Sequence, residues 1–143
     1  MEVIRVTEEW QRAGVHFVRA HAMIKEFGVS LDGEFADDTP ESLYILVLDG
    51  NYPVSTCRLH YLEDGVGKIE RVATVGEYRG KGYGAVAIRE AEEWMQENGV
   101  RKIYINSRTA ALGFYEKLGY TPDYNNRSGG GLFECVMTEK NLV

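Results

Sequence analysis

The stretch Ile69–Gly84 has the sequence IERVATVGEYRGKGYG, in which a strand-like run leads into a glycine-rich turn. Within the turn, Arg79–Gly84, three glycines alternate with two cations and a tyrosine. A helix is predicted next, because apolar residues recur at helical spacing as far as Asn98–Gly99: Ala87, Ile88, Ala91, Trp94 and Met95. The first turn of a helix offers unpaired N–H groups, and glycines let an anion approach them. The stretch therefore predicts a phosphate site at a helix start, with a ligand-free connection as the simpler alternative.

Three antiparallel strands are predicted ahead of this turn. The first is the continuous apolar run Leu43–Leu48, and the turn signal Asp49–Asn51 separates it from the second, Val54–Tyr61. A second turn signal, Glu63–Gly65, leads to the third strand, Gly67–Thr74. Short runs joined by Asp-Gly turns are typical of hairpins, so we expect these strands to be neighbours in one sheet.

The N-terminal part contributes one more strand and a helical region. Glu2–Thr7 alternates as a strand does, and apolar residues recur at roughly helical spacing over Trp10–Phe27 until Gly28 ends the pattern. The following segment, Val29–Ser42, is rich in Asp, Glu and Gly, so an irregular or short-helical connection is predicted.

The C-terminal part alternates between strands and a helix. A short strand is predicted over Lys102–Asn106 and a helix over Ala111–Leu118. Two last strands, Tyr120–Tyr124 and Leu132–Thr138, are joined by a flexible loop, Asn125–Gly131. The order of elements predicts a mixed α/β or α+β fold that forms a single domain over residues 1–143.

The composition is that of a globular protein, with 143 residues, 44% of them hydrophobic, and a net charge of -6. The acidic balance argues against non-specific binding to nucleic acid or to an anionic membrane, which needs a basic surface. It favours small or basic partners, although a solvated acidic surface is the simpler explanation of the charge.

A cytoplasmic location is expected. Cys57 and Cys135 lie far apart without a CxxC motif, as expected for two thiols in a reducing compartment. The first residues lack the basic stretch and apolar core of a signal peptide, and no apolar run is long enough to span a bilayer. No metal site is expected either. The three histidines are His16, His21 and His60, and no two of them have the spacing of metal ligands.

Two common phosphate-binding motifs do not explain the glycine-rich turn. A Walker A loop is excluded because Lys81 is followed by Gly82 and position 75 is valine. The dinucleotide pattern GxGxxG/A is matched literally by Gly80, Gly82 and Ala85. However, the predicted antiparallel strands precede it, and no acidic residue ends the next strand to hold a ribose.

The stretch Ile69–Gly84 resembles the central motif of the GNAT acetyltransferases, whose R/Q-x-x-G-x-G/A core is met by Arg79, Gly82 and Gly84. A second stretch, Phe114–Tyr120, has the sequence FYEKLGY and resembles the downstream fYeklGF motif of the same family. The segment that runs from Ile105 to Ala111 is also similar to the subgroup that includes the ElaA-like acetyltransferases. The resemblance implies a six- to seven-stranded, mostly antiparallel sheet with helices on both faces and a V-shaped splay between the fourth and fifth strands.

The resemblance further implies acetyl-CoA as the acyl donor. Pantetheine would lie along the strand end, which is formed by Val72, Ala73 and Thr74. The pyrophosphate would lie in the glycine-rich turn, which is formed by Arg79, Gly80, Lys81, Gly82, Tyr83, Gly84 and Ala85. Many members of the family carry an asparagine where Arg108 stands. Asn106 is expected to take its place, or Arg108 to reach a phosphate of CoA.

The implied activity is N-acetyl transfer to a primary amine by direct attack in a ternary complex. A backbone N–H near Val72–Ala73 would polarise the thioester carbonyl. Tyr115 would protonate the departing thiolate, because a phenol is a neutral donor at pH 7. Tyr115 also shares a helical face with Ala111 and Leu118, so an ordinary core position is the alternative.

Glu70 is the candidate general base. Strand alternation places it on the same face as Val72 and Thr74. Some family members carry a glutamate base on this strand, but near the position of Lys68. The alternative is a structural ion pair between Glu70 and Arg71, Arg58 or another cation.

The acceptor is expected to be a small-molecule or peptide amine, with no nucleic acid or membrane partner. In the family, its specificity comes largely from the region that corresponds to Trp10–Ser42. Carboxylates there would attract a cationic amine or form a solvated loop: Asp32, Glu34, Asp37, Asp38 and Glu41. Many relatives form a homodimer, which no residue here demands. A GNAT-fold module that binds acyl-CoA without catalysis is the alternative function, against which Tyr115 argues.

Overall fold

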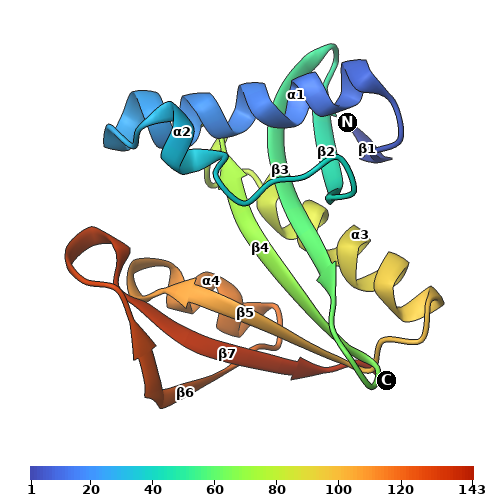
Figure 1. Cartoon of the computed structure of the whole chain (residues 1–143), viewed down its shortest axis with the longest axis vertical. Coiled ribbons are helices and arrows are strands. Elements are labelled where there is room, and N and C mark those ends of the chain that lie inside the picture. Colours follow the sequence, from blue (N-terminus) through green and yellow to red (C-terminus); the bar gives the residue numbers. More distant parts are fainter.

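The strands form one sheet in the order β1-β2-β3-β4-β5-β7-β6, and the computed structural model describes all residues, 1–143 (Figure 1). Neighbouring strands are antiparallel except β4 and β5, which are parallel. This confirms the predicted mixed, mostly antiparallel sheet. The strands are β1 (Glu2–Arg5), β2 (Leu43–Asp49), β3 (Tyr52–Tyr61), β4 (Val66–Thr74), β5 (Lys102–Arg108), β6 (Thr121–Ser128) and β7 (Cys135–Asn141).

Helices cover both faces of the sheet, and β2 shows how the two faces are divided. Tyr44, Leu46 and Leu48 belong to a core cluster with residues of the first helix, whereas Ile45 and Val47 belong to a cluster with the helix after the glycine-rich turn. The unbroken apolar run of β2 is explained because both of its faces are buried. The helices are α1 (Glu9–Arg19), α2 (Leu31–Glu34), α3 (Tyr83–Glu97) and α4 (Leu112–Lys117).

Strands β4 and β5 pair over only part of their length. Their ladder runs from Val66, opposite Lys102, to Ile69, opposite Ile105. Beyond that point β4 pairs only with β3, and β5 pairs only with β7. The two strands therefore diverge, as Figure 1 shows, which confirms the splay between the fourth and fifth strands.

The predicted loop over residues 125–131 is wrong in its first half. Strand β6 continues to Ser128, because Arg127 and Ser128 pair with β7 after a register shift that follows Asp123. These are exposed polar residues on an edge strand, so no apolar alternation marks them as a strand. The strand predicted from Leu132 begins only at Cys135, since Gly131–Phe133 forms a 3₁₀ turn.

The N-terminal helical region is not one regular α-helix. After α1 the chain forms a π-helical turn over Ala20–Lys25, which the apolar spacing did not indicate. Trp10, counted among the apolar positions, is 55% exposed. Such π turns are frequent at functional sites, and this one supplies Met23 to the cavity described below.

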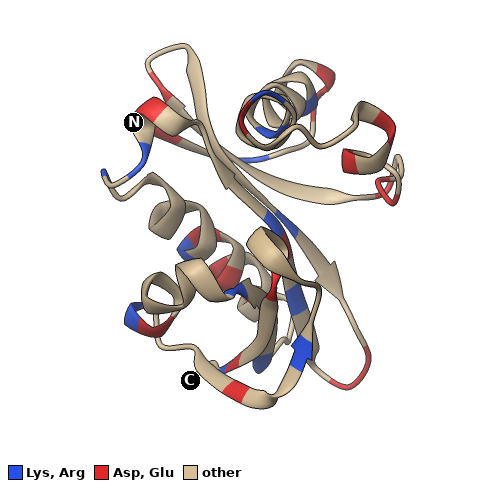
Figure 2. Ribbon diagram, turned by 90° about the vertical axis from the view of Figure 1, so that its left-hand side faces the viewer, with Lys and Arg blue, Asp and Glu red and all other residues tan.

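Charged residues of both signs are spread over the molecule. Figure 2 shows Lys and Arg interspersed with Asp and Glu along the ribbon rather than gathered on one face. None of the helices is both long and apolar enough to cross a bilayer. No group of three or more His, Cys, Asp or Glu side chains is placed to hold a metal ion.

Candidate active site

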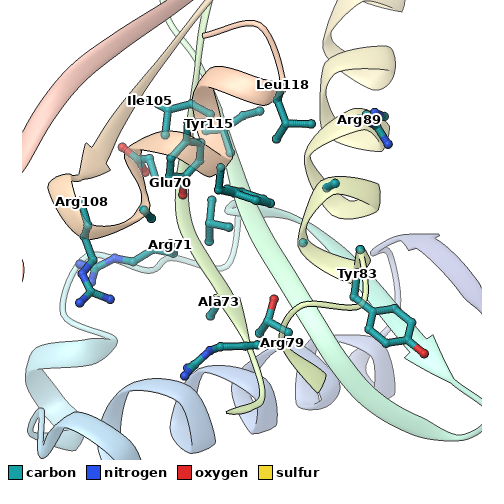
Figure 3. A pocket seen from close by; sticks show the side chains of 18 of the residues that line it. Glu70, Arg71, Ala73, Arg79, Tyr83, Arg89, Ile105, Arg108, Tyr115 and Leu118 are labelled. Carbon is teal, nitrogen blue, oxygen red and sulfur yellow. The ribbon is translucent and has the colours of Figure 1, made fainter. Parts of the chain in front are cut away.

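A cavity of about 670 Å³ lies where β4 and β5 diverge (Figure 3). Its wall includes the end of β4, the glycine-rich turn, the end of β5 and helix α4. Every site residue predicted from the sequence lines this cavity except Lys81. The Lys81 ammonium lies over the ring of Tyr78 instead, 5.4 Å from the ring centre.

Several lining residues were not predicted. Arg89 lies on α3, seven residues after Gly82, so helical spacing could have placed it on the same face as the turn. Arg71 was considered only as a partner of Glu70, and Glu34 only as one of several loop carboxylates. The other unpredicted lining residues are Met23, Ile69, Tyr78, Ile105, Ala111, Phe114, Lys117 and Leu118.

The glycine-rich turn needs backbone conformations that other residues avoid. Gly80 has a φ of +75°, and Gly82, which caps the N-terminus of α3, has a φ of +89°. A Cβ atom at either position would have no neighbour within 4 Å, so the space outside the turn is open. Since the first N–H groups of α3 point out of its N-terminus, the turn can receive an anion there.

The end of β4 contains a bulge that turns backbone groups toward the splay. Glu70 pairs with Arg58 on β3 and Ala73 pairs with Thr56, so two residues of β4 face a single residue of β3. One of the two, Arg71, has a φ of +51°, which is rare for a residue with a side chain.

The backbone groups that face the splay follow from the strand alternation. The N–H of Val75 donates to the carbonyl of Val54 on β3 at 2.9 Å. Alternation along an extended strand therefore directs the N–H group of Thr74 to the opposite edge, while Val72 lies in the bulge itself. Strand β5 has diverged from that edge, so the N–H of Thr74 is available to a ligand.

Tyr115 combines a core position with a position on the cavity. Its ring packs edge-on against Phe114 with centroids 5.0 Å apart, and the residue is only 7% exposed. Figure 3 shows its hydroxyl turned toward β4. Burial raises the pKa of the phenol well above its usual value, so the hydroxyl keeps its proton at neutral pH.

Glu70 forms the ion pair that was the alternative to its role as a base. Its Oε2 accepts hydrogen bonds from Arg58, from Nε at 3.0 Å and from Nη2 at 2.7 Å. Its Oε1 lies 3.4 Å from the ammonium of Lys68. Glu70 nevertheless lines the cavity and also a neighbouring pocket of about 530 Å³ beside β3. Its role as a base stays a prediction.

Asn106 and Arg108 line the cavity but also contact the end of β6 and the segment that follows it. The amide of Asn106 donates to Oγ of Ser128 at 3.1 Å, and Nε of Arg108 donates to the carbonyl of Leu132 at 3.1 Å. The guanidinium of Arg108 also lies over Phe27, 5.0 Å from the ring centre, and over Phe133 at 5.5 Å. Their contacts with a ligand stay a prediction.

The acidic segment after α1 is not a uniformly solvated loop. The side chains of Glu34 and Asp38 are 2% and 8% exposed, and both pair with the buried Arg19. Asp38 also accepts from Arg58, which links the network to Glu70. The solvated-loop alternative is therefore wrong for these two carboxylates.

Comparisons with known proteins agree with this geometry. The model of the Acetyltransferase (GNAT) family matches residues 4–120. The uncharacterized N-acetyltransferase YjcF of Bacillus subtilis is 31% identical over 120 residues, which cover 84% of this chain and 85% of YjcF. A crystal structure from Lactobacillus plantarum assigned as an N-acetyltransferase superposes with a TM-score of 0.90 at 30% identity and covers 99% of this chain and 98% of its own.

A third relative shares the fold and contains coenzyme A. The structure of an aminoglycoside 6′-N-acetyltransferase complexed with coenzyme A has a TM-score of 0.80 and covers 100% of this chain and 98% of its own. At 12% identity this likeness concerns the fold alone. Membership of the ElaA-like subgroup stays a prediction. The family model and these relatives show that the chain belongs to the GNAT family of acetyltransferases.

Proposed function

We propose that this chain, acting as one domain, transfers an acetyl group from acetyl-CoA to a primary amine by direct attack in a ternary complex. The observation that carries the proposal is the single cavity that joins the glycine-rich turn, the free edge of β4 and the hydroxyl of Tyr115. A diphosphate fits the open side of the turn, where Arg89 adds positive charge and Arg79 is paired with Glu26. Pantetheine fits the unpaired edge of β4 as an added strand would.

In the proposed reaction, each of three residues of the cavity has a separate role. Bound acetyl-CoA supplies the thioester carbon that the amine nitrogen attacks. The N–H of Val72 donates a hydrogen bond to the thioester oxygen as negative charge develops there. As the new C–N bond forms and the C–S bond breaks, Tyr115 gives its proton to the sulfur. The amine loses its proton to Glu70, directly or through water.

The proposal is tested by the release of CoA thiol from acetyl-CoA in the presence of a panel of amines. We expect at least one amine to accelerate thiol release and to appear as its N-acetylated product in equal amount. Thiol release that is the same with and without every amine, together with tight binding of acetyl-CoA, would identify a binding module instead.

Two glycine substitutions separate phosphate binding from backbone strain. Gly82→Ala and Gly99→Ala change residues with nearly equal φ, +89° and +91°, at the two ends of α3, and neither new methyl group meets an atom within 4 Å. Both are expected to cost about 1–2 kcal/mol of stability, because a left-handed conformation is strained for alanine.

Only Gly82→Ala is expected to weaken acetyl-CoA binding, by about tenfold or about 1.4 kcal/mol, because its methyl group occupies space that the pyrophosphate needs. Calorimetric titration of both variants with acetyl-CoA measures the difference. Equal affinities of the two variants for acetyl-CoA would contradict the placement of the pyrophosphate at the turn.

A further inference from the structure

Two carboxylates line the cavity, and they differ in what their oxygen atoms contact. Both oxygens of Glu70 have a cationic neighbour, as described above: Oε2 is hydrogen-bonded by Arg58, and Oε1 lies near Lys68. The side chain of Glu34 is only 2% exposed, and its Oε1 is buried without a hydrogen-bond partner. A buried carboxylate oxygen without a partner is rare in native proteins and calls for an explanation.

The position of the Glu34 side chain is fixed by Arg19. Nε of Arg19 donates to Oε2 of Glu34 at 2.9 Å, and Nη2 of Arg19 donates to the backbone carbonyl of Glu34 at 2.7 Å. The Oε1 of Glu34 lies 3.8 Å from Nη1 of Arg71, too far for a hydrogen bond. Arg71 also donates to Asp37 at 3.2 Å. The unpartnered Oε1 therefore belongs to a side chain that lines the cavity, and it can accept a hydrogen bond.

This oxygen lies away from the phosphate end of the cavity. Figure 3 shows Arg71, the neighbour of Glu34, across the cavity from Tyr83 and Arg89. Five cations line the cavity: Arg71, Arg79, Arg89, Arg108 and Lys117. Arg79 of the turn and Arg89 of α3 suit the phosphates of the donor, whereas Arg71 and Arg108 lie on the side of Glu34 (Figure 3). An acidic oxygen on the opposite side suits a ligand of opposite charge.

We propose that the free carboxylate oxygen of Glu34 binds the ammonium group of the acceptor, and that the acceptor is therefore a cationic alkylamine. This inference rests on the proposed acetyl transfer and assigns the residue that selects the acceptor. An ammonium donates charge-assisted hydrogen bonds to a carboxylate, whereas an arylamine is uncharged at neutral pH and gains much less. Glu34 acts on binding, so its loss changes the KM for the amine rather than the KM for acetyl-CoA.

The test compares Glu34→Gln with Asp32→Asn, using spermidine as the amine. The glutamine oxygen can still accept from Arg19, while its NH₂ group replaces the free oxygen at the cavity. Asp32 belongs to the same short helix and is exposed, so its substitution removes the same charge without touching the cavity. We expect Glu34→Gln to raise the KM for spermidine at least tenfold with the KM for acetyl-CoA unchanged, and Asp32→Asn to change neither.

Calorimetric titration of spermidine into the CoA-saturated protein gives the same comparison without turnover. A rise in the melting temperature of Glu34→Gln with acetyl-CoA shows that this variant is folded. If Glu34→Gln does not fold, the wild type alone still tests the proposal. We expect the wild type to acetylate n-butylamine with a kcat/KM at least tenfold higher than that for p-toluidine.

Equal use of the two monoamines, or an unchanged KM and affinity for spermidine in Glu34→Gln, would overturn the role of Glu34. Absence of any amine-dependent thiol release overturns the proposed acetyl transfer instead. In that case the role of Glu34 stands only if spermidine binds the wild type and binds Glu34→Gln at least tenfold more weakly.

Discussion

Replacement of Tyr115 by phenylalanine is expected to lower kcat by about 100-fold or more, with the KM for acetyl-CoA nearly unchanged. The substitution keeps the ring, which packs against Phe114, and removes only the hydroxyl that faces β4. Without that proton donor the sulfur must leave as a thiolate or take its proton from water. The measurement is steady-state kinetics with saturating amine under conditions in which the chemical step limits turnover.

Tyr120→Phe is the matched control. Tyr120 is a buried tyrosine of the same core cluster, but its hydroxyl donates to Glu92 at 2.7 Å and does not line the cavity. Its substitution is expected to lower the melting temperature and to leave kcat unchanged. If Tyr115→Phe retained the wild-type kcat, Tyr115 would be an ordinary core residue.

The burial of Tyr115 also predicts how activity depends on pH. Because burial raises the pKa of its phenol, the hydroxyl remains protonated through the range in which an exposed tyrosine would titrate. A loss of activity within or below the pH range in which an exposed tyrosine titrates must therefore come from a group other than Tyr115.

Replacement of Arg19 by methionine is expected to lower the free energy of unfolding by about 3–5 kcal/mol. Arg19 is fully buried and is the hydrogen-bond donor to both Glu34 and Asp38. The substitution leaves two carboxylates in the interior with one cation fewer, and methionine cannot donate to them. Urea unfolding followed by circular dichroism measures the change.

Arg5→Met is the control for this prediction. Arg5 pairs with Glu90 and Glu97 at the surface, where water and salt screen the charges. We expect its unfolding midpoint to stay close to that of the wild type. Similar midpoints for the two variants would show that burial gives the Arg19 network no special importance for stability.

Local signals predicted the parts of the fold that depend on neighbouring residues. The run Leu43–Leu48 and the Asp-Gly turns predicted the hairpins because such turns select antiparallel pairing. The resemblance of Ile69–Gly84 and Phe114–Tyr120 to motifs of the GNAT acetyltransferases implied the splay between β4 and β5. What failed, the extent of β6 and the π turn after α1, depends on tertiary pairing rather than on local pattern.

The candidate site shows the same division. Main-chain features of the glycine-rich turn were predictable, because left-handed conformations favour glycine. Side-chain directions were not predictable: Lys81 lies over Tyr78 and does not line the cavity, and Glu70 pairs with Arg58. Glu34 could not be distinguished from its acidic neighbours, because only the folded chain brings it against Arg19.

The central claim is that the splay between β4 and β5 with its glycine-rich turn is an acetyl-CoA site. The most direct test is the shift in melting temperature with acetyl-CoA, free CoA, NAD and ATP, each at the same concentration. At a hundred times its dissociation constant a ligand stabilises the folded state by about 2.7 kcal/mol. We predict a rise of several degrees with acetyl-CoA and with CoA and none with NAD or ATP. A rise with NAD or ATP equal to that with acetyl-CoA, or no rise with acetyl-CoA, would contradict the account.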